Sequence, residues 1–251
     1  MRNIKLTLAY DGTGFSGYEL QREKRTVRSE IEKAFFKLFK SHPKIINSSR
    51  TDSGVHAASQ TISFTINNPI PISRIPAALN NCLPEDIRAI KAEEKRLHAR
   101  FDAKNKEYEY LIFNGLILPP IYRNFVWQVR AKLDMPAMKK AARVLVGRHD
   151  FSSFCAAGSD GRNFTRVIFR LSVSKKRIRI WDGTVLPVIS FKVKGDGFLH
   201  KMVRNMVGTL VEVGLGKTNL LEVRKILGGK DRRLAGRTAP ARGLCLVKVN
   251  Y

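Results

Sequence analysis

The chain has 251 residues, of which 46 are Lys or Arg and 21 are Asp or Glu, so its formal net charge at pH 7 is +25. This excess of cations attracts polyanions, and it favours nucleic acid, ahead of an anionic membrane surface, as the partner. Three scattered cysteines without C-x-x-C spacing argue against a structural zinc site. No apolar run approaches the roughly 18 residues of a membrane span, and a reducing cytoplasm is the expected compartment.

The first 104 residues predict six elements in the order β-α-β-β-α-β. Residues 4–10 alternate between apolar and polar side chains, which is typical of a strand. Thr26 is placed to cap a helix with an apolar stripe, made of Ile31, Ala34, Phe35, Leu38 and Phe39. Further strands are predicted at 44–46, 60–66 and 86–92, and a short helix at 73–81. This is the order of ferredoxin-like domains.

Residues 105–251 predict a similar series. The expected strands are 107–113, 165–174, 185–195 and 244–249, and the expected helices are 134–147, 199–213 and a last one from a cap at Asn219 to Gly228. In the strand at 165–174, alternation places Val167, Phe169, Leu171 and Val173 on the buried face. We therefore predict an α+β fold of two ferredoxin-like β-α-β-β-α-β halves, 1–104 and 105–251, which share a central antiparallel sheet and leave a ligand cleft between them.

The glycines Gly12, Gly14 and Gly17 match the G-x-G-x-x-G pattern of dinucleotide sites and follow a predicted strand. Such a site needs a helix that begins at the glycine loop, and the next convincing cap, Thr26, comes too late. The glycines are better interpreted as a tight turn or a close backbone approach. The five histidines form no H-x-x-x-H pair, so we predict neither a metal nor a cofactor.

The segment SSRTDSGVHA, residues 48–57, is a polar loop between two predicted strands, and Ser53-Gly54 is typical of a turn. Loops on a rigid scaffold often carry catalytic groups. Asp52 could therefore be catalytic, or it could form a simple salt bridge with Arg50 at a hairpin tip. His56 is interpreted as a packing or hydrogen-bonding residue rather than a general base.

Two further segments carry candidate binding residues. Tyr108 and Tyr110 share one face of a predicted strand, where they could pack across strands or form a platform for a nucleobase. Arg204 lies in a helix that is otherwise mostly apolar. It could be on the exposed face, or it could be held at the edge of a site, facing a carboxylate or a phosphate.

The chain resembles the tRNA pseudouridine synthase A family along its whole length. The segments that carry the resemblance occur in the family's order, and they are SRTDSGVHA, HARFDAKNKEYEYLIFN, DFSSFCAAG, GDGFLHKMVRNMVGTLVEVG and TAPARGLCLVKVNY. The resemblance implies a cofactor-free isomerisation of uridine to pseudouridine in the anticodon stem-loop of tRNA, at tRNA positions 38 to 40. It also implies a homodimer.

Carried onto this sequence, the resemblance makes Asp52 the essential aspartate and Tyr108 the tyrosine that packs against the target base. Arg204 and Arg50 correspond to the family's arginines near that aspartate, and one of them is expected to orient Asp52 and keep it charged. Two departures are Ser49, where the family usually has Gly, and Tyr18-Glu19, where it usually has Trp-Gln. We expect the first to alter a turn and the second to alter contacts with RNA. A relative that acts on another RNA or position, or a non-catalytic RNA-binding protein, stays as an alternative.

Overall fold

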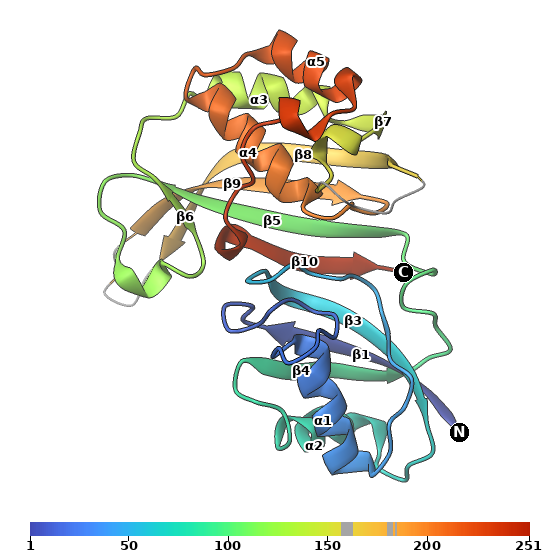
Figure 1. Cartoon of the computed structure of the whole chain (residues 1–251). Coiled ribbons are helices and arrows are strands. Elements are labelled where there is room, and N and C mark those ends of the chain that lie inside the picture. Colours follow the sequence, from blue (N-terminus) through green and yellow to red (C-terminus); the bar gives the residue numbers. More distant parts are fainter. Residues whose placement is uncertain (157–162, 180–182, 184) are drawn as a thin grey trace. The chain divides into compact units, whose positions relative to one another are not determined.

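The computed structural model describes residues 1–156, 163–179, 183 and 185–251. The chain forms two compact units, the first made of Met1–Lys106 and Cys245–Tyr251 and the second of Glu107–Leu244. Each unit combines helices with a sheet (Figure 1), which confirms the predicted α+β class. Within the described ranges, no helix is both long and apolar enough to pass through a bilayer.

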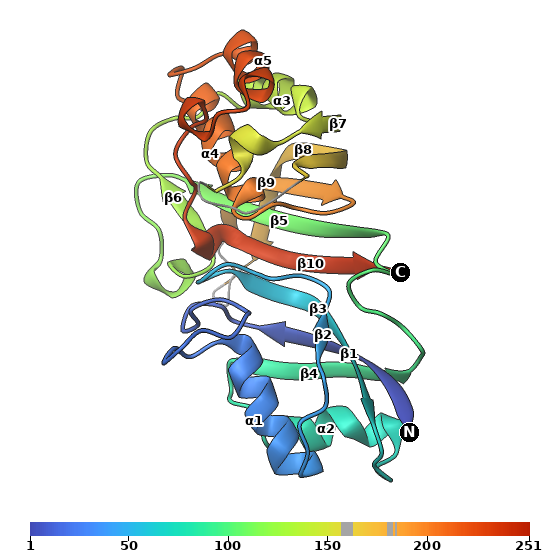
Figure 2. The ribbon, with the colours of Figure 1, turned by 45° about the vertical axis from the view of Figure 1, so that its right-hand side comes forward.

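The first unit contains the β-α-β-β-α-β series that the sequence predicts. Its elements are β1 (Arg2–Tyr10), α1 (Val27–Phe39), β2 (Ile46–Asn47), β3 (His56–Ile66), α2 (Ile75–Asn80) and β4 (Ile87–Glu94). Strand β1 pairs with β3 and β4, and β2 pairs with β3, all antiparallel. The last strand of the chain, β10 (Leu244–Asn250), pairs with β3 in parallel. Helices α1 and α2 lie beside each other in both views (Figures 1 and 2).

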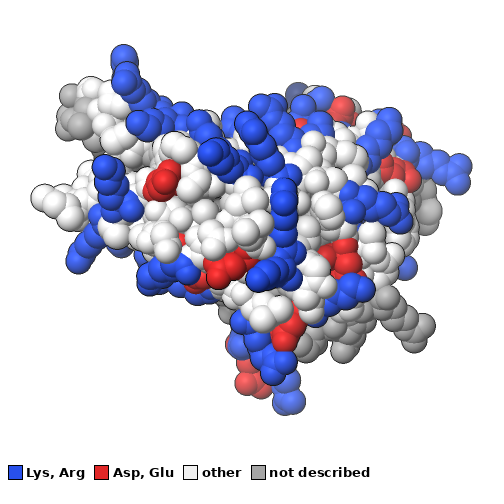
Figure 3. All heavy atoms as spheres, turned by 90° about the horizontal axis from the view of Figure 1, so that it is seen from above, with Lys and Arg blue, Asp and Glu red and all other residues white. Residues whose placement is uncertain are grey.

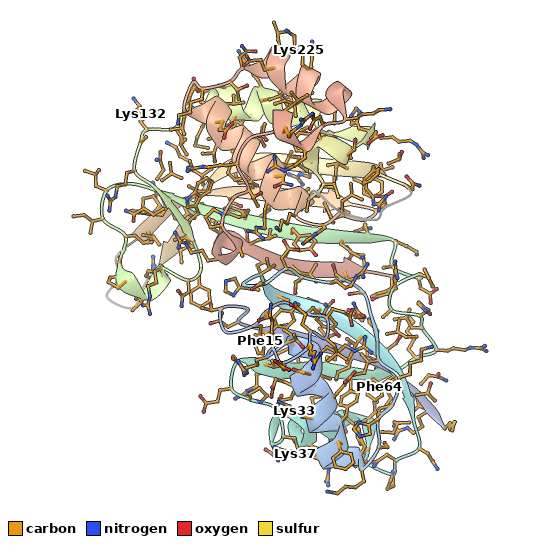
Figure 4. All side chains as sticks on the ribbon, viewed as in Figure 1. Phe15, Lys33, Lys37, Phe64, Lys132 and Lys225 are labelled. Carbon is orange, nitrogen blue, oxygen red and sulfur yellow. The ribbon has the colours of Figure 1, made fainter. Side chains whose placement is uncertain are left out.

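Local sequence explains the helix and core of this unit. Thr26 forms a capping box with Ser29, in which each side chain hydrogen-bonds the other's backbone N–H. Phe35 of α1 packs on Phe64 of β3, with ring centroids 4.6 Å apart. Figure 4 shows Lys33 and Lys37 on α1 as well, and both are exposed. The predicted apolar stripe thus faces the sheet, and the charged face of α1 meets solvent.

The second unit is built on a sheet in the order β5-β9-β8-β7, with β6 beside β5. Its elements are β5 (Asn105–Asn114), β6 (Trp127–Val129), α3 (Met135–Val144), β7 (Gly147–Asp150), β8 (Thr165–Arg179), β9 (Val185–Gly195), α4 (Met202–Gly214) and α5 (Leu220–Gly229). The pairs β7–β8 and β8–β9 are antiparallel, whereas β6 runs parallel to β5. Strands β6 and β7 were not predicted, because they are only three and four residues long.

The predicted inward position of Phe169 is wrong. Its side chain is 50% exposed, whereas Ile168, Leu171 and Val173 are buried. The register of β8 against β9 shifts between Ile168 and Arg170, which face Gly195 and Lys194. An irregularity of this kind adds a residue to one strand and reverses the alternation beyond it. Simple period-two counting cannot detect it.

Two boundaries also differ from the predictions. Helix α3 ends at Val144, and Gly147, which we expected to terminate it, begins β7 with φ of 114°. Residues 245–251, which we placed with the second half, belong to the first compact unit. The division at 104/105, the two ferredoxin-like halves in detail and their shared sheet with a cleft stay predictions.

Candidate active site

Asp52 lies in a tight turn between β2 and β3. The Val55 N–H donates to the Asp52 carbonyl oxygen at 3.1 Å, and Gly54, the third residue of the turn, has φ of 76°. Glycine adopts this backbone conformation without steric cost. The predicted Ser53-Gly54 turn is therefore confirmed, and it leaves the Asp52 side chain partly exposed.

The loop that follows β1 braces this turn. The Tyr18 N–H donates to the Thr51 carbonyl at 3.0 Å, and the Gly54 N–H and the Ser53 hydroxyl both donate to the Phe15 carbonyl, at 3.3 and 3.1 Å. Side chains add to the brace, since the Tyr10 and Thr51 hydroxyls are hydrogen-bonded at 2.8 Å. The residues on either side of Asp52 are thus held from a separate segment of the chain.

Phe15 anchors the bracing loop itself. Phe15, labelled in Figure 4, is 3% exposed. The Arg25 guanidinium lies over its ring, 4.2 Å from the centroid. Arg25 makes a bidentate pair with Asp86, just before β4, at 2.7 and 2.8 Å. This pair and the cation–π contact hold the loop to the rigid sheet, which in turn fixes the Asp52 backbone.

Arg50 lies two residues before Asp52 and is exposed to solvent. Among the residues that the structure describes, Arg50 forms no ion pair with a carboxylate, and the hairpin-tip salt bridge with Asp52 is absent there. Its guanidinium is accessible to a negatively charged ligand.

Tyr108 and Tyr110 lie on the same buried face of β5, as the alternation predicted. Tyr110 is fully buried and its hydroxyl donates to the Pro240 carbonyl at 2.7 Å. Burial raises the pKa of Tyr110, although the positive charges of Arg204, Arg242 and Arg237 oppose the rise. Tyr108 is 6% exposed and meets Phe198 edge to face, with centroids 5.1 Å apart. The two tyrosines therefore have different environments despite their matching positions.

Arg204 projects from the first turn of α4 and is held by the segment that precedes β10. Its Nε donates to the Ala239 carbonyl at 2.8 Å, and the Ala239 N–H donates to the Arg204 carbonyl at 3.1 Å. The Arg204 side chain is half-buried, so it lies neither on a fully exposed face of α4 nor wholly within the core. Its fixed geometry suits an arginine that is presented to an anionic group.

The next residue, Asn205, is a buried hub that the sequence analysis missed. Its amide donates to the Phe154 carbonyl at 2.7 Å, and its Oδ1 accepts from Thr238 at 2.7 Å and from Arg232 at 3.1 Å. Burial lowers the pKa of Arg232, with the charge of Glu212 opposing this. A polar residue within the apolar stripe of a helix is the signal that could have pointed to this network.

The two departures from the family pattern have clear structural settings. The Ser49 carbonyl accepts from Gln60 at 2.6 Å and from Asn47 at 3.1 Å, next to the Asp52 turn. Tyr18 is fully buried and its hydroxyl has no partner among the described atoms. Tyr18 lies in the core, so it could alter contacts with RNA only through the residues that pack on it, and that expectation stays a prediction. Glu19 pairs with Arg28 at 2.6 Å.

Two other expectations concern the segment DFSSFCAAG and the binding of metal ions. Ala157 and Gly158, at the end of the segment DFSSFCAAG, lie outside the described residues. Over the described ranges, no group of three or more His, Cys, Asp or Glu side chains is placed to hold a metal ion. The three cysteines, Cys82, Cys155 and Cys245, all lie in the described residues and form no disulfide.

The fold and these residues define a basic α+β protein with a carboxylate on a braced loop. A sequence model described as tRNA pseudouridine synthase matches residues 7–102 and 141–251. The chain belongs to this family.

Curated relatives match over the full length. The chain is 41% identical to the tRNA pseudouridine synthase A of Thermoanaerobacter sp. (strain X514), with 100% of both chains covered. It is 44% identical to that of Moorella thermoacetica, with 99% of both chains covered. Among solved structures, a Cbf5-Nop10-Gar1 complex aligns with a TM-score of 0.37 and 11% identity, over 96% of this chain and 57% of that chain.

Proposed function

We propose that the protein is an isomerase that converts uridine to pseudouridine at tRNA positions 38 to 40, with Asp52 as its catalytic carboxylate. The observation that carries the proposal is the turn of Asp52, which is braced on both sides by hydrogen bonds from residues 15–18 while its side chain stays partly exposed. Membership of the tRNA pseudouridine synthase family supports the reaction class and the tRNA substrate.

The chemistry requires one reactive group rather than a cofactor. The C1′–N1 bond breaks, the uracil turns over, and C5 bonds to C1′. C5 then loses a proton and N1 gains one, so the product is an isomer and no electrons are transferred. A carboxylate can attack C1′, attack C6, or remove a proton while a glycal forms. The Asp52 carboxylate could act in any of these three ways.

Tyr108, Arg50 and Arg204 are proposed to bind the substrate. The Tyr108 ring, already held edge-on by Phe198, would keep the detached uracil in place. Arg204, fixed through Ala239, would meet an anionic group, either a phosphate or the Asp52 carboxylate, and the exposed Arg50 would meet a phosphate. Such contacts orient a reacting carboxylate and favour its charged form.

The uridine has to leave its stack before it reacts, at a cost of a few kcal/mol. Contacts with the rest of the tRNA can offset that cost. A net charge of +25 suits this purpose, because cations bind the phosphates of a folded RNA by shape rather than by sequence. Several neighbouring uridines can then be substrates of one site.

The family resemblance further supports a homodimer, and a tRNA is large beside a chain of 251 residues. The cytoplasm is the proposed compartment, because the substrate is tRNA. Light scattering at working concentration tests the dimer, and a fully active monomer would contradict it.

The function is tested by incubating the protein with unmodified tRNA. Carbodiimide labelling followed by reverse transcription should give stops at positions 38 to 40. Stops elsewhere in the RNA would indicate a relative with another target, and no stops at all would indicate a protein that binds RNA without modifying it.

A further inference from the structure

A groove of about 950 Å³ lies in the second unit between α3, β7 and α5. The cationic residues that line it come from all three of these parts of the chain, and they are Lys140, Arg143, Arg148, Arg224 and Lys230. Asp150 is the only carboxylate in the lining. In Figure 3, seen from the end at which α3 and α5 lie in Figure 1, blue Lys and Arg side chains are spread widely over the surface, with smaller red patches of Asp and Glu among them.

Most of these cations have no carboxylate partner among the described residues. Lys230 lies 3.8 Å from Asp150. Burial raises the pKa of Asp150, but the hydrogen bond from the Ser152 N–H and the charge of Lys230 outweigh it, so the pKa is lowered. In the described parts of the chain, Lys140, Arg143, Arg148 and Arg224 form no ion pair with a carboxylate. Four positive charges therefore face solvent around one concave surface.

The remaining lining adds no further carboxylate. Val144, Leu220 and Leu227 contribute apolar side chains, and Gly228 and His149, whose Nε2 lies 3.0 Å from the Val146 carbonyl, complete it. The N-terminus of α5 is closed by its own capping box, in which Asn219 accepts from the Leu221 and Glu222 N–H groups. An anion would consequently be bound by the side chains of the groove and not by the α5 backbone.

The kind of ligand follows from exposure and charge. All five cationic residues are exposed, so the groove does not enclose a small molecule as typical ligand pockets do. Packing against a second copy of the same surface would bring like charges together, which is unfavourable. Exposed Lys and Arg side chains along an open groove suit a chain of phosphates, where each neutralised phosphate releases counterions.

We propose that the groove between α3, β7 and α5 binds the phosphate backbone of RNA. The proposal rests on the proposed function, because the tRNA substrate is the polyanion it names. It goes further by assigning part of the RNA contact to five side chains that play no part in the chemistry at Asp52.

The test compares two double variants that remove the same charge. Arg143→Gln with Arg224→Gln removes two groove cations. Lys132→Gln with Lys225→Gln removes two exposed lysines of the same unit that do not line the groove and that project into solvent (Figure 4). Affinity for unmodified tRNA is measured by filter binding over a range of salt concentrations, and thermal unfolding verifies that both variants fold.

For the wild type, neutralisation of roughly 5 to 8 phosphates gives a slope of log affinity against log salt of about −4 to −7. The groove variant should lose about tenfold in affinity at moderate salt, and its slope should become shallower by about 2. The control should change affinity less than about threefold. Equal losses in the two variants would overturn the proposal, because they would reflect net charge alone. A dimer that dissociates only in the groove variant would also overturn it, since the groove would then be an interface between copies.

Pseudouridine formation separates this proposal from the proposed function. If the wild type modifies tRNA, the groove variant should raise KM and keep kcat at saturating tRNA. If the wild type forms no pseudouridine but the groove variant alone binds tRNA more weakly, the groove proposal stands and the enzymatic function fails.

Discussion

Gly12 and Val55 are in such close contact that a side chain at position 12 would overlap the Val55 carbonyl oxygen, and a Cβ there would lie 2.9 Å from the Val55 nitrogen. The Gly12 N–H also donates to Nδ1 of His56 at 3.1 Å. Val55 closes the turn that carries Asp52. The glycine that resembles a dinucleotide motif therefore serves the close backbone approach that the sequence suggested.

Gly12→Ala should displace the Asp52 turn, because the obstacle is backbone and cannot rotate away. We expect kcat for pseudouridine formation to fall by at least about tenfold, equivalent to 1.4 kcal/mol of barrier. Gly14→Ala is the matched control, since its Cβ would meet side-chain atoms and no backbone: Arg25 Nη1 at 3.2 Å and Asp86 Oδ2 at 3.7 Å. Single-turnover assays of both variants measure the effect, and equal activity in the two would refute this role of Gly12.

Asp52→Asn keeps the size of the side chain and removes its charge and its nucleophilic oxygen. Turnover should become undetectable, because an amide neither attacks carbon nor accepts a proton at neutral pH. Affinity for tRNA should change by less than about tenfold, or 1.4 kcal/mol. Single-turnover conversion near the wild-type level would falsify the catalytic assignment, whereas a joint loss of binding and rate would indicate a structural role.

Tyr108→Phe should keep tRNA affinity and lose more rate than Tyr110→Phe, because it keeps the ring that would hold the uracil and removes a hydroxyl that we expect to act beside it. Tyr110→Phe removes a buried hydrogen bond to Pro240, so it should lower the free energy of unfolding by about 1 kcal/mol and leave the rate nearly unchanged. Chemical denaturation and single-turnover kinetics on both variants distinguish the two effects. If both variants had small and equal effects on rate, Tyr108 would be a packing residue without a role in the reaction.

Gly208→Ala should destabilise the second unit, since a Cβ on this α4 residue would overlap the Arg237 carbonyl oxygen. We expect a loss of about 2 kcal/mol or more in the free energy of unfolding, as for other overpacked cores. Gly228→Ala on α5 has open space and should instead be neutral or stabilising by up to about 1 kcal/mol. Thermal unfolding measures both, and a neutral Gly208→Ala would show that residues 236–239, which hold Arg204, can move.

The sequence by itself determined most elements and one feature of the site. The Thr26 and Asn219 caps, the alternation in β1 and the Ser53-Gly54 turn depend on residues within a few positions of one another, so their local chemistry is sufficient. The sequence also indicated a polyanionic partner, because the net charge is a count of residues and does not depend on how the chain folds.

Only the tertiary structure decided the rest, because those features depend on residues far apart in the chain. The register shift that exposes Phe169 arises from the pairing of β8 with β9. Tyr18 is buried by packing that no local pattern encodes. The brace on the Asp52 turn joins residues 15–18 to 51–54, and the basic groove joins α3 to α5 across about eighty residues of sequence. Sequence patterns report which faces are apolar, whereas the partner of each face is set by how the whole chain packs.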